Sequence, residues 1–293
     1  MSKKRTAFTL IELSIVLLII GIITTGITQS SRLISGFRLS SAQNLTKNSP
    51  VSSIEGLTAW WETTMEGNFI DKEMVDGGAI TRWNDINPQT NSKHNITQAA
   101  PAAPSYAKSA INNLPALLFD GAVNYLEFPY DADFASNDFT FFAVMRPLAA
   151  PAATNYGTIL SNRDLTAKGF SLYISSGLQY QTWLGINNST WQGSTILSSA
   201  TTIKKSELIS ATYNSDSGTY KLYQNTVLKG TGSYAPYAIN TQRPLRIGAG
   251  QNESATPASY FNGYIGEIII FNRSLKFEER LSVETYLKKK WGI

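Results

Sequence analysis

The chain has 293 residues and no cysteine, and its only histidine is His94. Thiol catalysis, zinc-finger spacing and multi-histidine metal sites are therefore excluded. The formal net charge is +4, but Lys3, Lys4 and Arg5 supply three of these charges, so the rest of the chain is nearly neutral. It shows no basic stripe and no nucleic-acid-binding motif, so nucleic acid is not an expected partner. Hydrophobic residues make up 42% of the chain, which is enough for a packed core.

The N-terminus combines a short basic head with an almost uninterrupted apolar run from Phe8 to Ile27. As a helix, about 20 apolar residues cross the hydrocarbon core of a bilayer. The basic cluster is expected to stay in the cytoplasm, which sends the C-terminal part of the chain outward. Glu12 interrupts the run, and an ionised side chain near mid-bilayer costs about 2.5–3.5 kcal/mol on insertion scales. Glu12 therefore either has a functional partner or reaches back to the cytoplasmic interface.

The stretch KKRTAFTLIEL from Lys3 to Leu13 closely resembles the prepilin leader of type IV pilins and type II secretion pseudopilins. The resemblance implies that a prepilin peptidase and methylase cuts after Ala7 and that Phe8 becomes the N-methylated N-terminus. Glu12 matches the glutamate that pairs, in this family, with the N-terminal amine of a neighbouring subunit. Such a pair neutralises two unfavourable buried charges between staggered subunits and sets their register. The implied partners are other pilin subunits, the peptidase and the inner membrane.

Two features depart from the pilin pattern. Ala7 stands where the family usually has Gly, and no proline lies between Phe8 and Lys47, where major pilins often carry one. The missing proline favours a minor pilin or a pseudopilin. Beyond the bilayer the helix is expected to continue as an amphipathic stalk that ends before Pro50, because proline disfavours helix in the residue before it. We therefore divide the chain into a leader (1–7), an assembly helix and stalk (8–49) and a domain (50–293).

From Ile54 onward, short β-rich runs separated by Gly, Asn, Asp and Pro predict a sandwich or barrel. The predicted strands are Ala116–Phe119, Phe139–Met145, Thr158–Leu160, Phe170–Ile174, Leu178–Leu184, Leu208–Tyr213, Tyr220–Gln224, Leu245–Ile247 and Gly263–Phe271. One helix is predicted from Lys276 to Lys290, with Ser274 as its N-cap and an apolar face that packs on the sandwich.

Several segments, in their order along the chain, resemble the concanavalin A-like, laminin-G-type jelly-roll superfamily. They are LTAWW at 57–61, RWND at 82–85, LPALLFDG at 114–121, FTFFAVMRP at 139–147 and FNGYIGEIIIFN at 261–272. The resemblance covers most of residues 55–293 and implies two antiparallel sheets with a mildly concave face. The expected fold class is thus mainly β, with a jelly-roll sandwich on a long N-terminal α-helix and a short C-terminal helix.

Catalysis is not expected. Glycosidases on this fold need two carboxylates that face one sugar bond about 5–9.5 Å apart. The chain has no Glu-x-Asp-x-x-Glu run, and the acidic residues between Glu66 and Asp76 lack strand alternation, which predicts a solvated surface. Glu267 lies in an apolar strand and is expected to bond a neighbouring loop. No Gly-x-Ser-x-Gly elbow accompanies His94, which is predicted to lie in a surface loop.

Calcium is common at the rim of this fold, where loops supply oxygen ligands. Asp120, Asn124, Asp131 and Asp133 are the candidate ligands for Ca²⁺. Asp and Asn in turns also cap backbone groups, so both roles stay open for these four residues.

Sugar binding would use aromatic side chains as platforms. Tyr180, Trp183 and Trp191 flank a predicted hairpin at 185–189 and are the candidates. Aromatic residues in a sandwich also form core, so a ligand-binding role and a packing role both remain open.

The leading hypothesis is a minor pilin that displays a lectin-like domain for adhesion to a glycan, host or matrix ligand. The alternative is a type II secretion pseudopilin whose domain only packs against its neighbours. A glycan-active enzyme is the third class, and the missing acid pair argues against it. The expected location is the bacterial inner membrane before assembly, and then a pilus or pseudopilus with the domain outside the cytoplasm.

Overall fold

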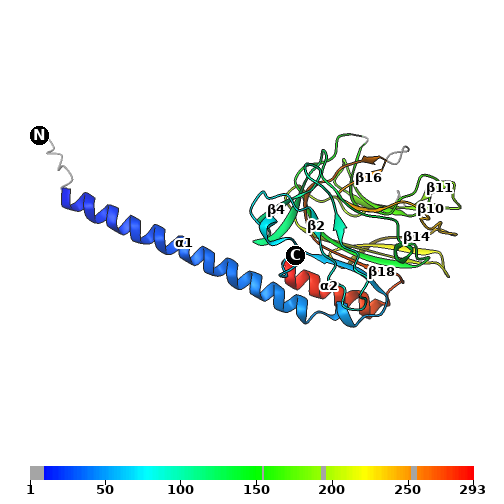
Figure 1. Ribbon diagram of the computed structural model, residues 1–293, viewed down its shortest axis with the longest axis horizontal. Helices are drawn as coiled ribbons and strands as arrows, with labels where there is room; N and C mark the ends of the chain where they lie inside the picture. The colour runs from blue at the N-terminus through cyan, green and yellow to red at the C-terminus, as the bar shows by residue number, and fades with distance from the viewer. Residues whose placement is uncertain (1–9, 154, 193–195, 252–255) are drawn as a thin grey trace, which may run out of the picture.

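A long helix extends away from a two-layered β-sandwich in the computed structural model, and a second helix lies along the sandwich (Figure 1). The structure describes residues 10–153, 155–192, 196–251 and 256–293, apart from the side chains at 10, 12 and 24–32. Helix α1 runs over Leu10–Lys47 and helix α2 over Phe277–Trp291. Three short 3₁₀ segments are η1 (Pro50–Ser53), η2 (Asp71–Glu73) and η3 (Ala132–Phe134).

Sheet A has eight strands, in the order β14-β13-β12-β7-β18-β5-β4, with β1 also paired to β18. Its strands are β1 (Leu57–Glu62), β4 (Ser105–Ile111), β5 (Leu114–Asp120), β7 (Phe139–Pro147), β12 (Glu207–Asn214), β13 (Thr219–Gln224), β14 (Val227–Ser233) and β18 (Asn262–Phe271). All of these strands pair antiparallel.

Sheet B has eight strands, in the order β11-β10-β9-β8-β15-β6-β3-β2. Its strands are β2 (Arg82–Trp83), β3 (Ile96–Thr97), β6 (Leu126–Phe128), β8 (Tyr156–Ser161), β9 (Phe170–Ser175), β10 (Tyr180–Ile186), β11 (Thr190–Gln192) and β15 (Leu245–Ile247). The short strands β16 (Gly250–Gln251) and β17 (Pro257–Ala258) form a separate pair. The predicted antiparallel sandwich and all of its predicted strands are confirmed.

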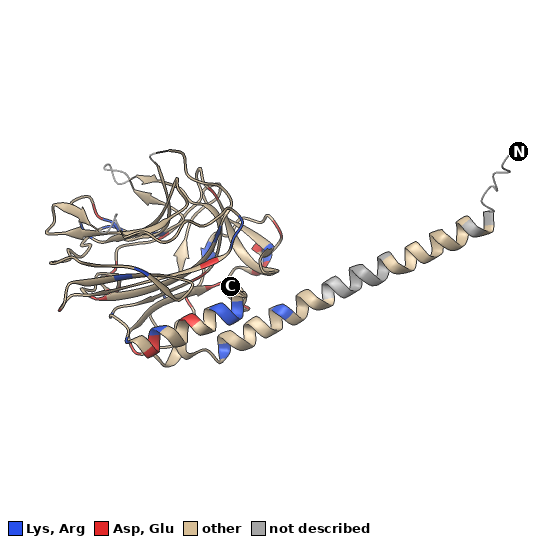
Figure 2. Cartoon of the chain, turned by 180° about the vertical axis from the view of Figure 1, so that it is seen from behind, with Lys and Arg blue, Asp and Glu red and all other residues tan. Residues whose placement is uncertain are grey.

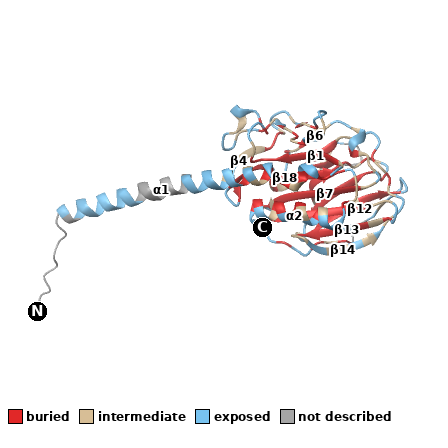
Figure 3. Cartoon of the chain, turned by 90° about the horizontal axis from the view of Figure 1, so that it is seen from below, coloured by how far each residue is buried: buried red, intermediate tan, exposed pale blue. Residues whose placement is uncertain are grey.

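The central strands of sheet A are buried on both faces. Its inner face meets sheet B in the main core, where Phe141 of β7 packs with Phe170 of β9. Its outer face forms a second core with the two helices, in which Phe142 and Ile269 pack with Trp291 of α2 and Ala42 of α1. This double burial explains why β7 and β18 are apolar almost throughout rather than alternating. Figure 3 shows these strands as buried.

Only one face of sheet B enters the main core, although the outer face of its central strands is also largely buried. In β9, Phe170, Leu172 and Ile174 enter the main core, whereas the intervening Ser171 and Tyr173 face the other way. No helix in the described part of the chain packs on this outer face, and the β16–β17 pair lies over part of it (Figure 1). Strand alternation in the sequence therefore separates core residues from outer-face residues in this sheet.

The N-cap of helix α2 lies two residues after the predicted one. The N-cap is Lys276 rather than Ser274, so the predicted cap is wrong. The reason is Glu279, whose carboxylate accepts a hydrogen bond from the Lys276 backbone N–H at 2.9 Å and thereby fixes the first turn. Gly292 ends the helix at φ 65°, a left-handed conformation that glycine adopts without strain.

Helix α1 ends at Lys47, just before the predicted stop at Asn48–Pro50, and only its last turns contact the sandwich. Farther out its described side chains are exposed, among them Leu33, Ile34 and Phe37 at 63%, 53% and 74% (Figure 3). The charged residues on the described part of α1 lie toward the sandwich end (Figure 2). Among the described residues, no helix meets the length and hydropathy needed to span a membrane. The predicted span, 8–27, begins before the described residues and ends among positions whose side chains are not described.

A buried charged network joins α2 to sheet A. Lys290 Nζ lies 2.7 Å from Glu62 Oε2 and 2.8 Å from Glu267 Oε2, and all three side chains are fully buried. The other Glu267 oxygen accepts hydrogen bonds from the Trp60 indole and the Tyr286 hydroxyl. Glu267 is therefore structural, as predicted, but its partners are β1 and α2 rather than a loop.

The attraction within this network outweighs the cost of burial. Burial would raise the pKa of Glu62, but Lys290, together with the hydrogen bonds from Thr64, lowers this pKa below its ordinary value. Burial would lower the pKa of Lys290, and the two carboxylates raise it instead. The Tyr286 hydroxyl also lies 3.2 Å from the Thr46 hydroxyl of α1, which ties the base of the long helix to the same network.

Candidate functional site

An aromatic row crosses the outer face of sheet B. It consists of Tyr156, Tyr173, Trp183 and Trp191, one each from β8, β9, β10 and β11. The Trp183 ring centroid lies 5.3 Å from that of Tyr156 and 5.6 Å from that of Tyr173, both edge to face. Tyr173 is 5% exposed, and the other three rings are half-buried.

Strand register places these rings on one face. Trp183 lies opposite Ser171 in the β9–β10 pair, and Tyr173, two residues along β9, therefore points to the same side. Trp191 lies opposite Gly185 on the neighbouring strand. A Cβ atom at Gly185 would lie 2.1 Å from the Ala167 carbonyl oxygen, so this close backbone approach requires glycine.

Arg163 lies at the end of the aromatic row. Its guanidinium carbon is 5.0 Å from the centroid of the Trp191 ring, a cation–π distance. One guanidinium nitrogen donates a hydrogen bond to the Gln251 carbonyl at 3.0 Å, which ties Arg163 to the β16–β17 pair. The row thus combines flat apolar rings with a fixed cationic donor.

The three sequence candidates for sugar binding are divided between the two faces of sheet B. Trp183 and Trp191 lie in the aromatic row, whereas Tyr180 lies in the main core with no exposed surface. Positions 180 and 183 differ by three, an odd number, and their side chains therefore point to opposite faces of the strand. Sequence reasoning missed Tyr156 and Tyr173, although their parity in β8 and β9 could have placed them.

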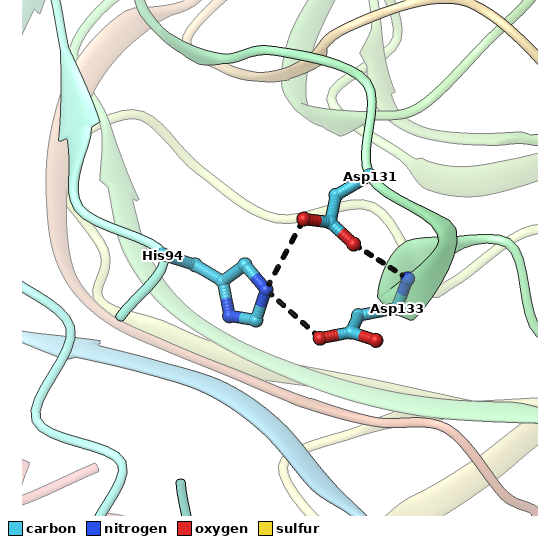
Figure 4. A group of neighbouring side chains, drawn as sticks. All are labelled: His94, Asp131 and Asp133. Atoms are coloured by element: carbon cyan, nitrogen blue, oxygen red, sulfur yellow. Dashed lines mark hydrogen bonds and ion pairs between the residues drawn. The ribbon is translucent and has the colours of Figure 1, made fainter. Parts of the chain in front are cut away.

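A second group of side chains lies near η3, where His94 meets Asp131 and Asp133 (Figure 4). His94 Nε2 is 3.2 Å from Asp133 Oδ2 and 4.0 Å from Asp131 Oδ2. The ligand atoms of all three residues lie within 4.8 Å of one another. The His94 ring packs edge to face against Phe128 and Phe134, which hold its orientation.

The predicted surface position of His94 is wrong, because the residue is only 2% exposed. Its Nδ1 lies 3.1 Å from the Thr58 carbonyl, an acceptor, and 3.6 Å from Asp85 Oδ2. Burial would lower the pKa of His94, but Asp85, with the charges of Asp131 and Asp133, outweighs burial and raises it. The polar sequence around His94 concealed contacts that come from distant segments.

The four predicted calcium ligands occupy two separate settings. Asp120 Oδ1 accepts hydrogen bonds from the backbone N–H groups of residues 122, 123 and 124, and these bonds lower the pKa of Asp120 although burial would raise it. Asn124 Oδ1 accepts from the Asp120 N–H at 3.2 Å, which closes the turn. Asp131 and Asp133 instead face His94. Within the described residues no contact joins the two pairs, and calcium binding at these positions stays a prediction.

The residues of the processing site lie outside the described residues. Ala7 and Phe8 precede Leu10, where the description of the chain begins. The backbone of Glu12 is helical in α1, and its side chain is not described. Their roles in cleavage and assembly therefore stay predictions.

The acidic stretch predicted to be solvated is partly structured. Glu66, Asp71 and Asp76 are exposed. The Glu73 carboxylate accepts hydrogen bonds from the backbone N–H and the hydroxyl of Thr81. Glu73 thus braces the turn before β2.

Two family models match the chain. The model for the concanavalin A-like lectin/glucanases superfamily matches residues 120–279, more than half of the chain. The chain therefore belongs to this superfamily. The model for the prokaryotic N-terminal methylation motif matches residues 2–28, so a pilin-type N-terminus precedes the sandwich. No curated protein matches the chain.

Solved structures share the sandwich at low sequence identity, which establishes the fold alone. The binding domain of Paraclostridial Mosquitocidal Protein 1 is 12% identical with a TM-score of 0.58, covering 81% of this chain and 55% of its own. The botulinum neurotoxin type C structure is 14% identical with a TM-score of 0.57, covering 82% of this chain and 53% of its own. Domain 4 of the arabinanase AbnA from Geobacillus stearothermophilus is 16% identical with a TM-score of 0.50, covering 78% of this chain and 97% of its own. The chain thus spans about half the length of the two toxin chains.

Proposed function

We propose that this chain is a minor pilin that displays a carbohydrate-binding domain for adhesion. The observation that carries the proposal is the aromatic row on the outer face of sheet B, a face without a packed helix among the described residues. Half-buried aromatic rings that remain accessible on such a face are suited to a ligand with both apolar and polar surfaces. Sugars have this character, because their ring C–H groups stack on aromatic rings while their hydroxyls take hydrogen bonds.

The row assigns different roles to its members. Trp183 is held between Tyr156 and Tyr173 and would serve as a rigid platform. Trp191 and Arg163 form the end at β11, where the guanidinium would donate to sugar hydroxyls. Two of the structurally similar proteins support this class of ligand, since AbnA domain 4 was solved with arabinotriose and cell entry of botulinum neurotoxin type C depends upon interaction with two ganglioside molecules.

Helix α1 would supply assembly. Its described apolar side chains beyond the sandwich are exposed, so they require lipid or neighbouring helices to cover them. In a bundle of such helices, Glu12 would pair with the methylated amine of Phe8 of another subunit. The chain would then lie in the bacterial inner membrane before assembly and in a filament afterwards, with the sandwich extracytoplasmic.

A glycan array with the full chain in detergent tests the binding role. We expect a defined set of glycans to bind and Trp183→Ala and Trp191→Ala to weaken binding at least tenfold. Phe277→Ala is the matched control, because Phe277 is 62% exposed on α2, on the opposite side of the sandwich. An array without hits, or equal binding by all variants, would remove the adhesin proposal.

Assembly is tested separately. The mature protein from cells should have the mass of a chain that begins at methylated Phe8, and Glu12→Ala should fail to enter filaments. A subunit labelled at filament tips supports the minor pilin, whereas recovery only with a type II secretion complex supports the pseudopilin alternative. We also propose that the domain binds without catalysis, and hydrolysis of any bound glycan by the full chain would overturn that point.

A further inference from the structure

The two nitrogens of the His94 imidazole lie in different surroundings. Nδ1 has a hydrogen-bond partner, whereas Nε2 faces groups that can only accept. Nδ1 faces the Thr58 carbonyl, which can only accept, so Nδ1 carries the proton of the neutral ring. Nε2 then presents a lone pair to two carboxylates, at 3.2 Å and 4.0 Å. A lone pair facing two anions is unfavourable unless a proton or a metal cation lies between them.

The groups that contact His94 Nδ1 match those found beside the non-ligating nitrogen of a metal-binding histidine. In such sites the ring nitrogen remote from the metal donates to a carbonyl or carboxylate, which fixes the tautomer. Here the Thr58 carbonyl and the buried Asp85 carboxylate occupy that side. Asp85 is itself held, since it accepts from the backbone N–H groups of Trp60 and His94. The nitrogen that faces the two aspartates is therefore oriented before any ligand arrives.

The two aspartates leave oxygens directed at the same point. Asp131 Oδ1 accepts from the Asp133 backbone N–H at 2.9 Å as the N-cap of η3, which leaves Oδ2 toward His94 (Figure 4). The Asp133 side chain is 58% exposed and that of Asp131 is 39% exposed, whereas that of His94 is 3% exposed. A cation can thus enter from solvent and meet one buried nitrogen and two accessible oxygens.

Spacing and charge indicate which cation fits. Bonds of about 2.0–2.1 Å to a tetrahedral zinc ion place neighbouring ligand atoms about 3.3 Å apart. The distance from Nε2 to Asp133 Oδ2 is 3.2 Å, and Asp131 Oδ2 needs only a small side-chain rotation. Two carboxylates and a neutral imidazole balance a divalent cation. Calcium takes six to eight oxygen ligands, so an imidazole in the set favours a transition metal.

We propose that His94, Asp131 and Asp133 form a binding site for a divalent transition-metal cation of the zinc class. The three residues would supply one nitrogen and two oxygens, and water would complete the tetrahedron. The ion would bridge the segment before β3 and the segment after β6, which are far apart in sequence. The site shares no residue with the aromatic row, so the metal-binding proposal does not depend on carbohydrate binding.

Metal binding to the full chain tests this proposal. The protein is purified in detergent without a polyhistidine tag, stripped with a chelator and titrated with ZnCl₂ in a calorimeter. We expect one Zn²⁺ per chain, at least a hundredfold preference over Ca²⁺, and a rise in melting temperature on saturation. Co²⁺ should give the visible absorption bands of tetrahedral coordination.

Variants assign the binding to these residues. Asp133→Asn should weaken Zn²⁺ binding at least tenfold and abolish the cobalt bands, and its exposure makes misfolding no concern. Asp216→Asn, an exposed aspartate in the β12–β13 loop, is the matched control and should bind as the parent does. His94→Gln should lose binding more completely. A parent chain that binds no Zn²⁺, equal affinity in Asp133→Asn, or tighter Ca²⁺ than Zn²⁺ binding would each overturn the proposal.

Discussion

The outer faces of the two sheets differ in what covers them and in how far their side chains are exposed. The outer face of sheet A is sealed by α2 and the last turns of α1, and its charged groups are buried and paired. The outer face of sheet B has no helix over it in the described residues, and its aromatic row keeps partial contact with solvent. Both faces carry tryptophan, but Trp291 is fully buried on the first and Trp191 half-buried on the second.

In the proposed function, this difference would separate attachment from recognition. Sheet A carries the junction with the long helix, where the contacts are mostly apolar and the buried charges of Lys290, Glu62 and Glu267 are paired. In the proposed function, sheet B would present side chains to a ligand. Substitutions on the first face should therefore cost stability, whereas those on the second should cost binding.

The largest effect is expected from Lys290→Met. The substitution leaves Glu62 and Glu267 as two buried carboxylates without their cation, which costs about 3–5 kcal/mol in comparable buried pairs. Lys289→Met is the matched control, because Lys289 is the exposed neighbour in the same helix. Chemical denaturation of the full chain in detergent should show a much lower midpoint for Lys290→Met only. Equal midpoints for the two variants would show that the network contributes little.

A smaller loss is expected from Gly266→Ala. A Cβ atom at Gly266 would lie 2.5 Å from the Trp291 ring, so β18 and α2 must move apart. Overpacking of this kind typically costs about 1–3 kcal/mol. Gly177→Ala is the control, because its nearest neighbour is 3.6 Å away. Thermal unfolding monitored by near-ultraviolet circular dichroism measures both, and an unchanged melting temperature for Gly266→Ala would contradict tight packing of α2 on sheet A.

On the other face, Trp191→Ala should lower the free energy of unfolding by less than about 1 kcal/mol, the usual value of an accessible cation–π contact. Denaturation and glycan binding are measured on the same preparation. The comparison predicts a clear loss of binding at nearly unchanged stability. A loss of stability as large as that of Lys290→Met would mean that the aromatic row is structural.

Most of the sandwich was predictable, because its central strands carry long apolar or alternating runs. The runs in β7 and β18 show this most clearly, since burial on both faces removes polar positions. Strands such as β14, whose residues are mostly exposed and include Lys229 and two glycines, lack that signal. The two-residue strands β2 and β3 exist only through pairing with distant segments. Local sequence cannot indicate such strands.

The sites were less predictable for the same reason. Lys290 and Glu62 are 228 residues apart, and nothing near either residue in sequence indicates the other. His94 lies in the polar stretch NSKHN, and its burial comes from Phe128, Phe134 and the Thr58 carbonyl. The tryptophans of the aromatic row were found because residue type alone suggested them. Their tyrosine neighbours required strand parity, and the same parity places Tyr180, for which a packing role was left open, in the main core.

The smallest predicted effect concerns pH at the edge of the sealed face. The Arg273 guanidinium donates to both Glu279 oxygens at 2.8 Å and 2.6 Å, and this hydrogen bonding lowers the pKa of Glu279 below its ordinary 4.5. A lowered folded-state pKa means that the pair stabilises the fold above pH 4.5 and loses this contribution as pH falls through the folded value. We expect about 0.5–1 kcal/mol, because both side chains are partly exposed.

Glu279→Gln isolates this contribution. Its melting temperature should lie below that of the parent at pH 7, and the gap should narrow as the pH is lowered from 5 to 3. Glu278→Gln is the control, since Glu278 is an exposed neighbour in the same first turn and should show no comparable gap. A gap that persists unchanged to pH 3 would assign the effect to the Lys276 cap rather than to the Arg273 charge. Either result concerns the edge of α2, and glycan binding on sheet B should stay the same in both variants.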